Sequence, residues 1–264
     1  MEVSNGVKKN KSARIPVKLI AVILIIFLVL SAILVYSLRS LRYCDYFKIK
    51  DVIARNGSPE GLAYLKGRNI FGIDLKYEVS RILELTPQAN RVSLIRLLPD
   101  RLFVDFIKRK PVALIRLYRY FDVDQDGVFF YATGSPEESM LPVIFGLEAK
   151  IFGPKPGKAY NKEELLLALN IIREMKLNRV LKNLKISKID VSSINNTSIY
   201  MPFASSEKAL KEVDSLEVRV GSGDIKNKVN ILSELIIVSK SDVTKIKYID
   251  LRFKEPVIKL KHAD

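Results

Sequence analysis

Cysteine, histidine and tryptophan are nearly absent from this chain. Its 264 residues include one cysteine, Cys44, one histidine, His262, and no tryptophan. A single thiol excludes an internal disulfide, and one thiol with one imidazole cannot supply the soft ligands of a zinc site. His262 lies in a short terminal stretch, so a Ser/His/Asp or Cys/His catalytic arrangement would need an unusual fold of the tail. We therefore expect no enzymatic activity, no metal ligands and no cofactor.

Charged residues are missing from one long segment near the start. Residues 19–36 are apolar except for Ser31 and Tyr36. Continued to Leu38, a helix here would measure about 30 Å, the thickness of the hydrocarbon core of a bilayer. A cleaved signal peptide is the alternative, but its apolar region is about 7 to 15 residues long and is followed by a small-residue cleavage site. We predict a transmembrane helix over residues 19–38.

Basic residues outnumber acidic ones, 44 to 29, which gives a formal charge of +15. Lysine and arginine are interspersed with aspartate and glutamate, without a basic stripe interleaved with aromatics, so nucleic acid is not the expected partner. Solvated faces near anionic lipid explain the excess better. Five basic residues precede the apolar segment and five follow it closely, so the positive-inside rule leaves the orientation open.

The region after the membrane segment alternates between strand and helix patterns. A strand is expected over 46–53, a helix beginning at Ser58-Pro59-Glu60, and a second helix whose stripe Leu75, Val79, Ile82 and Leu83 ends before Thr86-Pro87. Two further strands, 92–97 and 102–107, flank the turn pair Pro99-Asp100. The predicted order is strand, helix, helix, strand, strand.

The rest of the chain predicts a mixed α+β domain. A helical stripe lies within 161–178, and a short helix is expected near Asp224. The strand candidates are 186–191, 199–203, 216–220, the alternating run 246–253 and a last strand, 256–261. We predict an α+β fold with an antiparallel-rich sheet.

Two motifs suggest ligands but fit a structural role better. Asp122, Asp124 and Asp126 with Gly127 match the first half of a calcium-binding loop, yet Thr133 stands where the bidentate glutamate should be. A tight Asp-Gly hairpin turn is the preferred interpretation. The stretch 153–158 is one residue too short for a phosphate loop and holds two prolines, so we interpret it as a linker.

The ordered motifs behind the membrane segment resemble the FtsQ/DivIB family of bacterial cell division proteins. Residues 67–74, 96–102 and 108–113 resemble the POTRA domain of that family. Residues 124–129, 141–144 and 248–253 resemble, respectively, the turn, the strand and the closing strand of the domain that follows it. The resemblance implies a cytoplasmic tail (1–18), a POTRA domain (45–113) and a C-terminal FtsQ-type domain (114–264). Residues 192–220 do not align with the pattern.

The resemblance also implies a function. FtsQ proteins are non-enzymatic scaffolds of the divisome that recruit FtsB and FtsL at the septum and help control septal peptidoglycan synthesis. The expected location is the cell inner membrane, with the N-terminus cytoplasmic and the bulk of the chain outside the cytoplasm. One alternative is a POTRA-bearing envelope assembly or secretion factor. The other is a membrane-anchored cell-wall enzyme using Asp122, Asp124 and Asp126.

The expected partner-binding surface lies in the last strands. A strand pair at the edge of a sheet offers a row of free amides and carbonyls that another strand can join. By resemblance this is where FtsB docks, through apolar contacts and attraction of acidic residues. The alternative is that Phe253 and Ile258 belong to the core. The candidate residues are Arg252, Phe253, Glu255, Val257, Ile258 and Lys259.

Overall fold

The computed structural model describes residues 17–41, 43–132, 134, 138–202, 215–239 and 243–261. The predicted tail up to residue 16, Thr133, Phe203 and His262 lie outside this part of the chain. The chain divides into two compact units, residues 1–78 with 94–105 and residues 79–93 with 106–264. The predicted boundary at residue 113 stays a prediction.

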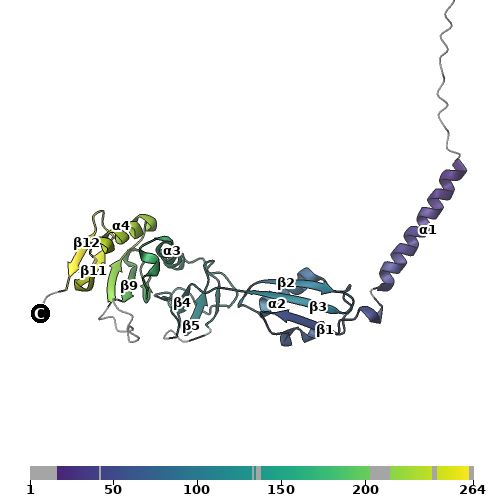
Figure 1. Cartoon of the computed structure of the whole chain (residues 1–264), viewed down its shortest axis with the longest axis horizontal. Coiled ribbons are helices and arrows are strands. Elements are labelled where there is room, and N and C mark those ends of the chain that lie inside the picture. Colours follow the sequence, from purple (N-terminus) through teal and green to yellow (C-terminus); the bar gives the residue numbers. More distant parts are fainter. Residues whose placement is uncertain are drawn as a thin grey trace, which may run out of the picture. The chain divides into compact units, whose positions relative to one another are not determined.

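The first helix, α1 (Val17–Leu41), has the length and composition of a membrane span. Its mean hydropathy over Ile20–Leu41 is 3.0, and its apolar side chains are exposed instead of packed against protein. Ser31 satisfies its hydroxyl by donating to the Leu28 carbonyl at 2.8 Å. A helix that is apolar on every side is stable in lipid and not in water, which confirms one N-terminal apolar helix of spanning length (Figure 1).

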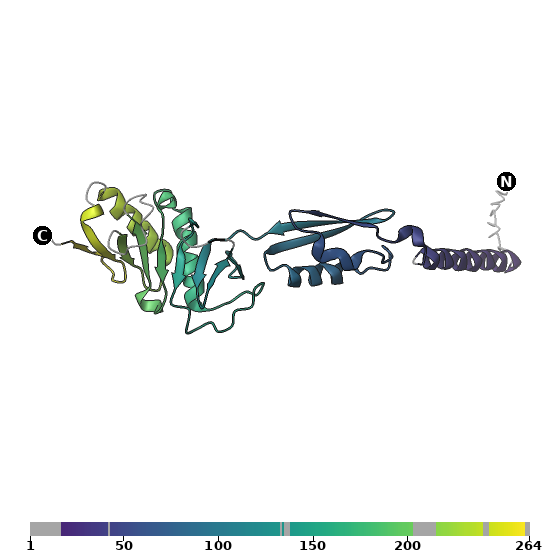
Figure 2. The ribbon, with the colours of Figure 1, turned by 90° about the horizontal axis from the view of Figure 1, so that it is seen from below.

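A three-stranded sheet follows, in the order β1-β3-β2; its strands are labelled in Figure 1, and Figure 2 shows the same unit from below. Its strands are β1 (Asp51–Arg55), β2 (Ala89–Leu97) and β3 (Arg101–Lys108). β1 and β3 run parallel, with Val52 opposite Leu102. The helical elements of this region all precede β2. They are the 3₁₀ helices η1 (Asp45–Phe47) and η2 (Glu60–Leu65) and the helix α2 (Leu75–Leu85).

Two predictions in this region need correction. The predicted strand 46–53 begins only at Asp51, because residues 45–47 close a 3₁₀ turn in which the Lys48 amide donates to the Asp45 carbonyl. The helix predicted after Ser58 is η2, a 3₁₀ helix. Gly67, with φ of +81°, ends that segment after six residues, which is too short for a stable α-helix. The second predicted helix and both later strands are confirmed.

The second unit holds a nine-stranded sheet in the order β12-β11-β10-β9-β8-β7-β4-β5-β6. Its strands are β4 (Ala113–Arg116), β5 (Tyr120–Val123), β6 (Phe129–Tyr131), β7 (Val143–Phe145), β8 (Lys188–Asp190), β9 (Ser198–Pro202), β10 (Ser215–Arg219), β11 (Ile246–Asp250) and β12 (Val257–Leu260). Between them stand the 3₁₀ turns η3 (Leu181–Asn183), η4 (Ile194–Asn196) and η6 (Val243–Lys245).

Two helices connect parallel neighbours in this sheet. β7 and β8 pair in parallel and are joined by α3 (Glu163–Leu177), while β10 and β11 pair in parallel and are joined by α4 (Ile225–Val238). Parallel strands need such a crossover, because the chain must return to the end of the sheet where the first strand began before the second strand can run in the same direction. Asp224 caps α4 by accepting the Asn227 amide at 3.1 Å. Both predicted helices are confirmed, and so is the α+β class.

One face of the sheet forms the core with these helices. Side chains that alternate along the central strands contribute to it, and so do the apolar stripes of α3 and α4. The members from neighbouring strands include Ile189, Ile199, Val218 and Ile249, which are at most 1% exposed. The opposite face carries aromatic and charged side chains. Successive residues of a strand therefore point alternately into the core and onto this polar face.

Candidate partner-binding surface

β12 is an edge strand of the nine-stranded sheet. Within the part of the chain that the structure describes, it pairs with β11 alone, and the Lys261 amide donates to the Lys245 carbonyl at 2.8 Å. Peptide groups alternate in direction along an antiparallel strand, so Val257 and Lys259 face β11 like Lys261. The amides and carbonyls of Ile258 and Leu260 face away from the sheet. Among the described residues β12 thus stands at the edge of the sheet, as predicted, and its outward groups belong to these two residues.

The side chains of β12 divide between the two faces of the sheet. Ile258 lies opposite Ile249 and Leu260 opposite Ile246, and both partners are buried core residues. Ile258 is nonetheless 40% exposed, because no strand covers its outer side. Val257 and Lys259 lie opposite Asp250 and Tyr248 on the other face. A strand added at this edge would extend the core beside Ile258 and Leu260.

The closing strand ends earlier than predicted. β11 stops at Asp250, and residues 251–256 form a turn before β12. The cause is the Asp250 carboxylate, which accepts the Arg252 amide at 3.1 Å and so bends the chain away from the extended direction. Phe253 lies in this turn with 62% of its surface exposed, so it does not belong to the core.

Arg252 is committed to contacts within the chain. Its Nη2 lies 2.6 Å from Asp250 Oδ2, and its Nη1 donates to the Asn196 side-chain oxygen at 2.6 Å. Hydrogen bonds from this guanidinium hold the pKa of the buried Asp250 carboxyl below its usual value. Arg252 thus fixes the turn that presents Phe253 and Glu255. Sequence reasoning missed Asn196, because nothing in the sequence brings position 196 near 252.

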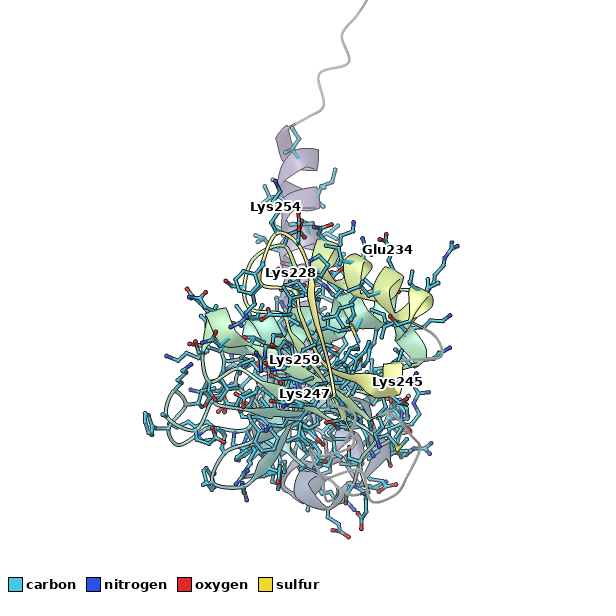
Figure 3. The ribbon with its side chains drawn as sticks, turned by 90° about the vertical axis from the view of Figure 1, so that its left-hand side faces the viewer. Lys228, Glu234, Lys245, Lys247, Lys254 and Lys259 are labelled. Atoms are coloured by element: carbon cyan, nitrogen blue, oxygen red, sulfur yellow. The ribbon has the colours of Figure 1, made fainter. Side chains whose placement is uncertain are left out.

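Lysines surround the edge strand. Of the eight charged residues between 245 and 261, six are basic, and the two acids are the paired Asp250 and the exposed Glu255. Figure 3 shows Lys245, Lys247, Lys254 and Lys259 on this end of the unit. Lys247 lies at a register shift between Ile246 and Tyr248, a bulge that the sequence pattern did not indicate. The edge therefore presents a positive potential to its surroundings.

Tyr248 links two of the cationic side chains. The Arg219 guanidinium carbon lies 4.0 Å from the centre of its ring, and the Lys259 ammonium lies 6.0 Å from it. These cation–π contacts hold Lys259 over the sheet face. An acidic side chain of a bound strand would meet Lys259 beside this aromatic ring.

The opposite edge of the sheet is occupied by a loop at Phe129. β6 is only three residues long, and its Phe129 amide donates to the Lys158 carbonyl at 3.2 Å, while the Gly157 amide donates to the Phe129 carbonyl at 2.7 Å. The stretch 153–158, interpreted as a linker, thus pairs with Phe129 at this edge, and its Gly157 amide is used within the chain. β12 is the longer of the two edge strands, which makes it the better acceptor for a partner strand.

The aspartate-rich turn connects β5 to β6, as predicted. Gly127 has φ of +73°, and Asp124 accepts the amides of Asp126 at 3.0 Å and Val128 at 2.9 Å. Asp124 also pairs with Arg109 at 2.6 Å. Within the described residues no group of three metal-ligating side chains occurs. The bonds of the Asp124 carboxylate therefore stabilise the hairpin.

Comparisons with known proteins agree with this architecture. The family model described as "Cell division protein FtsQ/DivIB, C-terminal" matches residues 113–252, which include every strand from β4 to β11. A protein named "Cell division protein FtsQ" from Geotalea daltonii is 24% identical over 193 residues, which cover 73% of this chain and 66% of that protein. Another of that name, from Syntrophotalea carbinolica, is 24% identical over 221 residues, or 81% of this chain and 74% of that protein. The matched family region ends at Arg252, before β12.

Proposed function

Because this chain belongs to the FtsQ/DivIB family of cell division proteins, we propose that it is a single-pass inner-membrane scaffold of the bacterial divisome. In this proposal it recruits FtsB and FtsL-like bitopic proteins at the septum and helps to control septal peptidoglycan synthesis without catalysing a reaction. The N-terminus is cytoplasmic, and the residues after α1 lie outside the cytoplasm. The open, lysine-rich edge of β12 is the observation that carries the proposal.

The physical basis is strand addition at β12. A partner segment would pair with the outward amides and carbonyls of Ile258 and Leu260, and would place apolar side chains against these residues and acidic ones near Lys259. Phe253 and Glu255, exposed in the preceding turn, would contact the end of that segment. Anchoring by α1 raises the effective concentration of other membrane-anchored proteins, so a short strand contact is sufficient.

The two alternative functions lack support of this kind. An envelope assembly or secretion factor would use a POTRA domain to feed substrates to a membrane barrel, whereas here the lysine-rich edge lies in the FtsQ/DivIB region and its continuation. A cell-wall enzyme would need carboxylates free to accept or donate protons. Asp124 instead pairs with Arg109 and two backbone amides.

The direct test is capture of division partners from membranes. The intact protein should co-purify with FtsB- and FtsL-like proteins, and Lys259→Glu should reduce that capture at least several-fold. Lys155→Glu is the matched control, since Lys155 is an exposed lysine on a loop distant in sequence. Full capture by a folded chain truncated after Phe253 would refute the placement at β12.

The strand-addition mechanism has its own pair of variants. Leu260→Pro removes an outward amide, whereas Leu260→Ala trims the same side chain and keeps that amide. Proline at Val257 would not separate binding from folding, because the Val257 amide faces β11. Both variants lose apolar contact at position 260, so capture that falls clearly further with proline than with alanine supports strand addition. Equal capture by both variants would count against it.

Orientation needs a separate measurement. A reporter that is active only in the cytoplasm, fused after Asp264, should be silent. Strong activity of that reporter would reverse the proposed topology.

A further inference from the structure

The residues immediately after the membrane helix form a compact surface of their own. We propose that this surface, made of Tyr43, Tyr46, Lys48, Lys50 and Leu98 and here called the collar, docks onto the phospholipid headgroups of the bilayer that α1 crosses. The proposal concerns the first unit alone, so it does not depend on the division partners or on β12.

The distance along the chain places the collar at the bilayer surface. A helix over residues 19–38 fills the hydrocarbon core of about 30 Å, so Leu41 ends about 4.5 Å beyond it. The headgroup layer on each side is about 5 to 8 Å thick. Only residues 42–44 separate α1 from η1, and Tyr46 belongs to η1. Tyr43 and Tyr46 therefore follow α1 closely enough for their side chains to reach into the headgroup layer.

Hydrogen bonds hold the unit to the end of α1. The Asn69 side-chain amide donates to the Leu41 carbonyl at 3.0 Å and to the Cys44 carbonyl at 3.2 Å. The Tyr43 amide donates to the Ser40 carbonyl at 3.0 Å. Asn69 thus satisfies one of the carbonyls that a helix leaves free at its C-terminus, and it ties residues of the folded unit to the membrane helix. This connection is short and bonded, unlike a flexible linker.

Aromatic residues give the collar an affinity for the interface. Tyr46 is 63% exposed, and its ring packs edge-on against Phe47 with centroids 5.2 Å apart. Phe47 packs in the same way against Phe71 at 5.1 Å. Tyrosine is enriched at membrane interfaces because its ring prefers the acyl boundary while its hydroxyl stays hydrated. A supported, exposed tyrosine beside a membrane helix therefore fits the headgroup layer.

The turn between β2 and β3 completes the collar. The Lys50 amide donates to the Asp100 carbonyl at 2.8 Å, which brings residues 98–100 beside the start of β1. Leu98 is 59% exposed in this turn. An exposed leucine costs free energy in water and gains it at the acyl boundary. Leu98 would thus enter the same layer as Tyr46.

Charge supports the same orientation. Lys48 and Lys50 are exposed and form surface ion pairs with Asp45 at 2.7 Å and Asp100 at 2.9 Å. Such exposed pairs contribute little and rearrange easily. Their ammonium groups are long enough to reach lipid phosphates while the stems cover apolar surface. Each pair is neutral as a whole, so each lysine adds attraction for the phospholipid surface by exchanging its aspartate for a lipid phosphate.

Depth measurements on the full chain test this proposal. In a Cys44→Ser background, which removes the only cysteine, an environment-sensitive fluorophore is placed at Leu98→Cys or at Ser58→Cys. Ser58 follows the other end of β1, whose five residues extend about 13 Å. In vesicles of phosphatidylcholine with phosphatidylglycerol, doxyl-labelled lipid should quench the probe at position 98 at least threefold more than the probe at 58. Equal quenching at both positions would overturn the proposal.

A second comparison separates docking from mere proximity to the membrane. Tyr46→Ser should lower lipid quenching at position 98 at least twofold, and Lys48→Glu should lower it further. The control is Tyr77→Ser, which removes a 65% exposed tyrosine on α2 in the same unit. If Tyr46→Ser and Tyr77→Ser leave the quenching equally unchanged, the tyrosine does not dock, and the collar proposal fails.

Discussion

Removal of the Arg252 guanidinium should destabilise the second unit substantially. The Asp250 carboxylate is buried and accepts two hydrogen bonds from Arg252, from Nε at 2.9 Å and from Nη2 at 2.6 Å. Breaking a buried ion pair from one side costs about 3 to 5 kcal/mol, because the other charge is left without a partner. In Arg252→Ala the backbone amide of residue 252 still donates, and water can enter near the sheet edge. We therefore expect a loss of about 2 to 3 kcal/mol.

The loss should be visible as a change in melting temperature. For a unit of this size, 1 kcal/mol corresponds to about 2 to 4 °C, so Arg252→Ala should melt about 5 to 10 °C below the wild type at pH 7. The chain has no tryptophan, so circular dichroism of the full chain in mild detergent is the suitable signal. Asp250→Asn added to Arg252→Ala should recover part of the lost stability, because burying an unpaired neutral amide costs less free energy than burying an unpaired carboxylate.

The pH dependence gives an independent check. The folded-state pKa of Asp250 is depressed by the Arg252 hydrogen bonds, so this stabilisation is fully present above the unfolded pKa of about 3.9. It is lost as the pH falls through the lower folded-state pKa. The difference in melting temperature between wild type and Arg252→Ala should therefore be constant from pH 5 to 7 and shrink below about pH 4.

A surface arginine provides the control. Arg173 pairs with Glu174 at 3.3 Å but is mostly exposed, so Arg173→Ala should change the melting temperature by less than about 2 °C. If Arg252→Ala also melts within 2 °C of the wild type at pH 7, the account of Asp250 as a buried charge that depends on Arg252 is incorrect.

Three further predictions concern other parts of the chain. Calorimetry should show no saturable calcium binding at sub-millimolar concentration, because the carboxylate of Asp124 is already occupied; a one-site isotherm abolished by Asp124→Ala would contradict this. Gly146→Ala should cost more than about 3 kcal/mol, since its φ is +90° and a Cβ would lie 2.3 Å from the Ser192 amide nitrogen; a melting temperature equal to that of the wild type would show that the loop relaxes freely. A chain of residues 1–113 should still reach midcell to some degree, and even spreading around the membrane would locate the recruiting surface elsewhere.

Local patterns predicted most of the helices well. The stripe of Leu75, Val79 and Ile82 and the capping residue Asp224 depend on neighbours within one or two turns, so the sequence alone was sufficient for α2 and α4. The same holds for the hairpin around Gly127, whose positive φ is a local requirement.

The remaining features depend on contacts between distant residues. The pattern from Ile246 to Phe253 continues to alternate, yet the strand ends at Asp250 because that carboxylate bonds the chain two residues later. The bulge at Lys247 and the contact of Arg252 with Asn196 likewise arise only when β11 is placed in the sheet. The edge itself was predictable, whereas the identity of its outward peptide groups needed the register of β12.

The unequal edges of the nine-stranded sheet limit how copies of this protein can associate. Growth of a filament by strand pairing needs two acceptor edges on every copy, one for the preceding subunit and one for the next. Here the outward amide and carbonyl of Phe129 on the β6 edge are bonded to the 157–158 loop, so among the described residues the two edges are unequal acceptors for strand pairing. Two copies that met through β12 would form a closed pair, and a partner strand on β12 would exclude that pairing. A copy whose β12 edge is occupied by a partner strand therefore offers a neighbouring copy the short β6 edge, which is already occupied at Phe129.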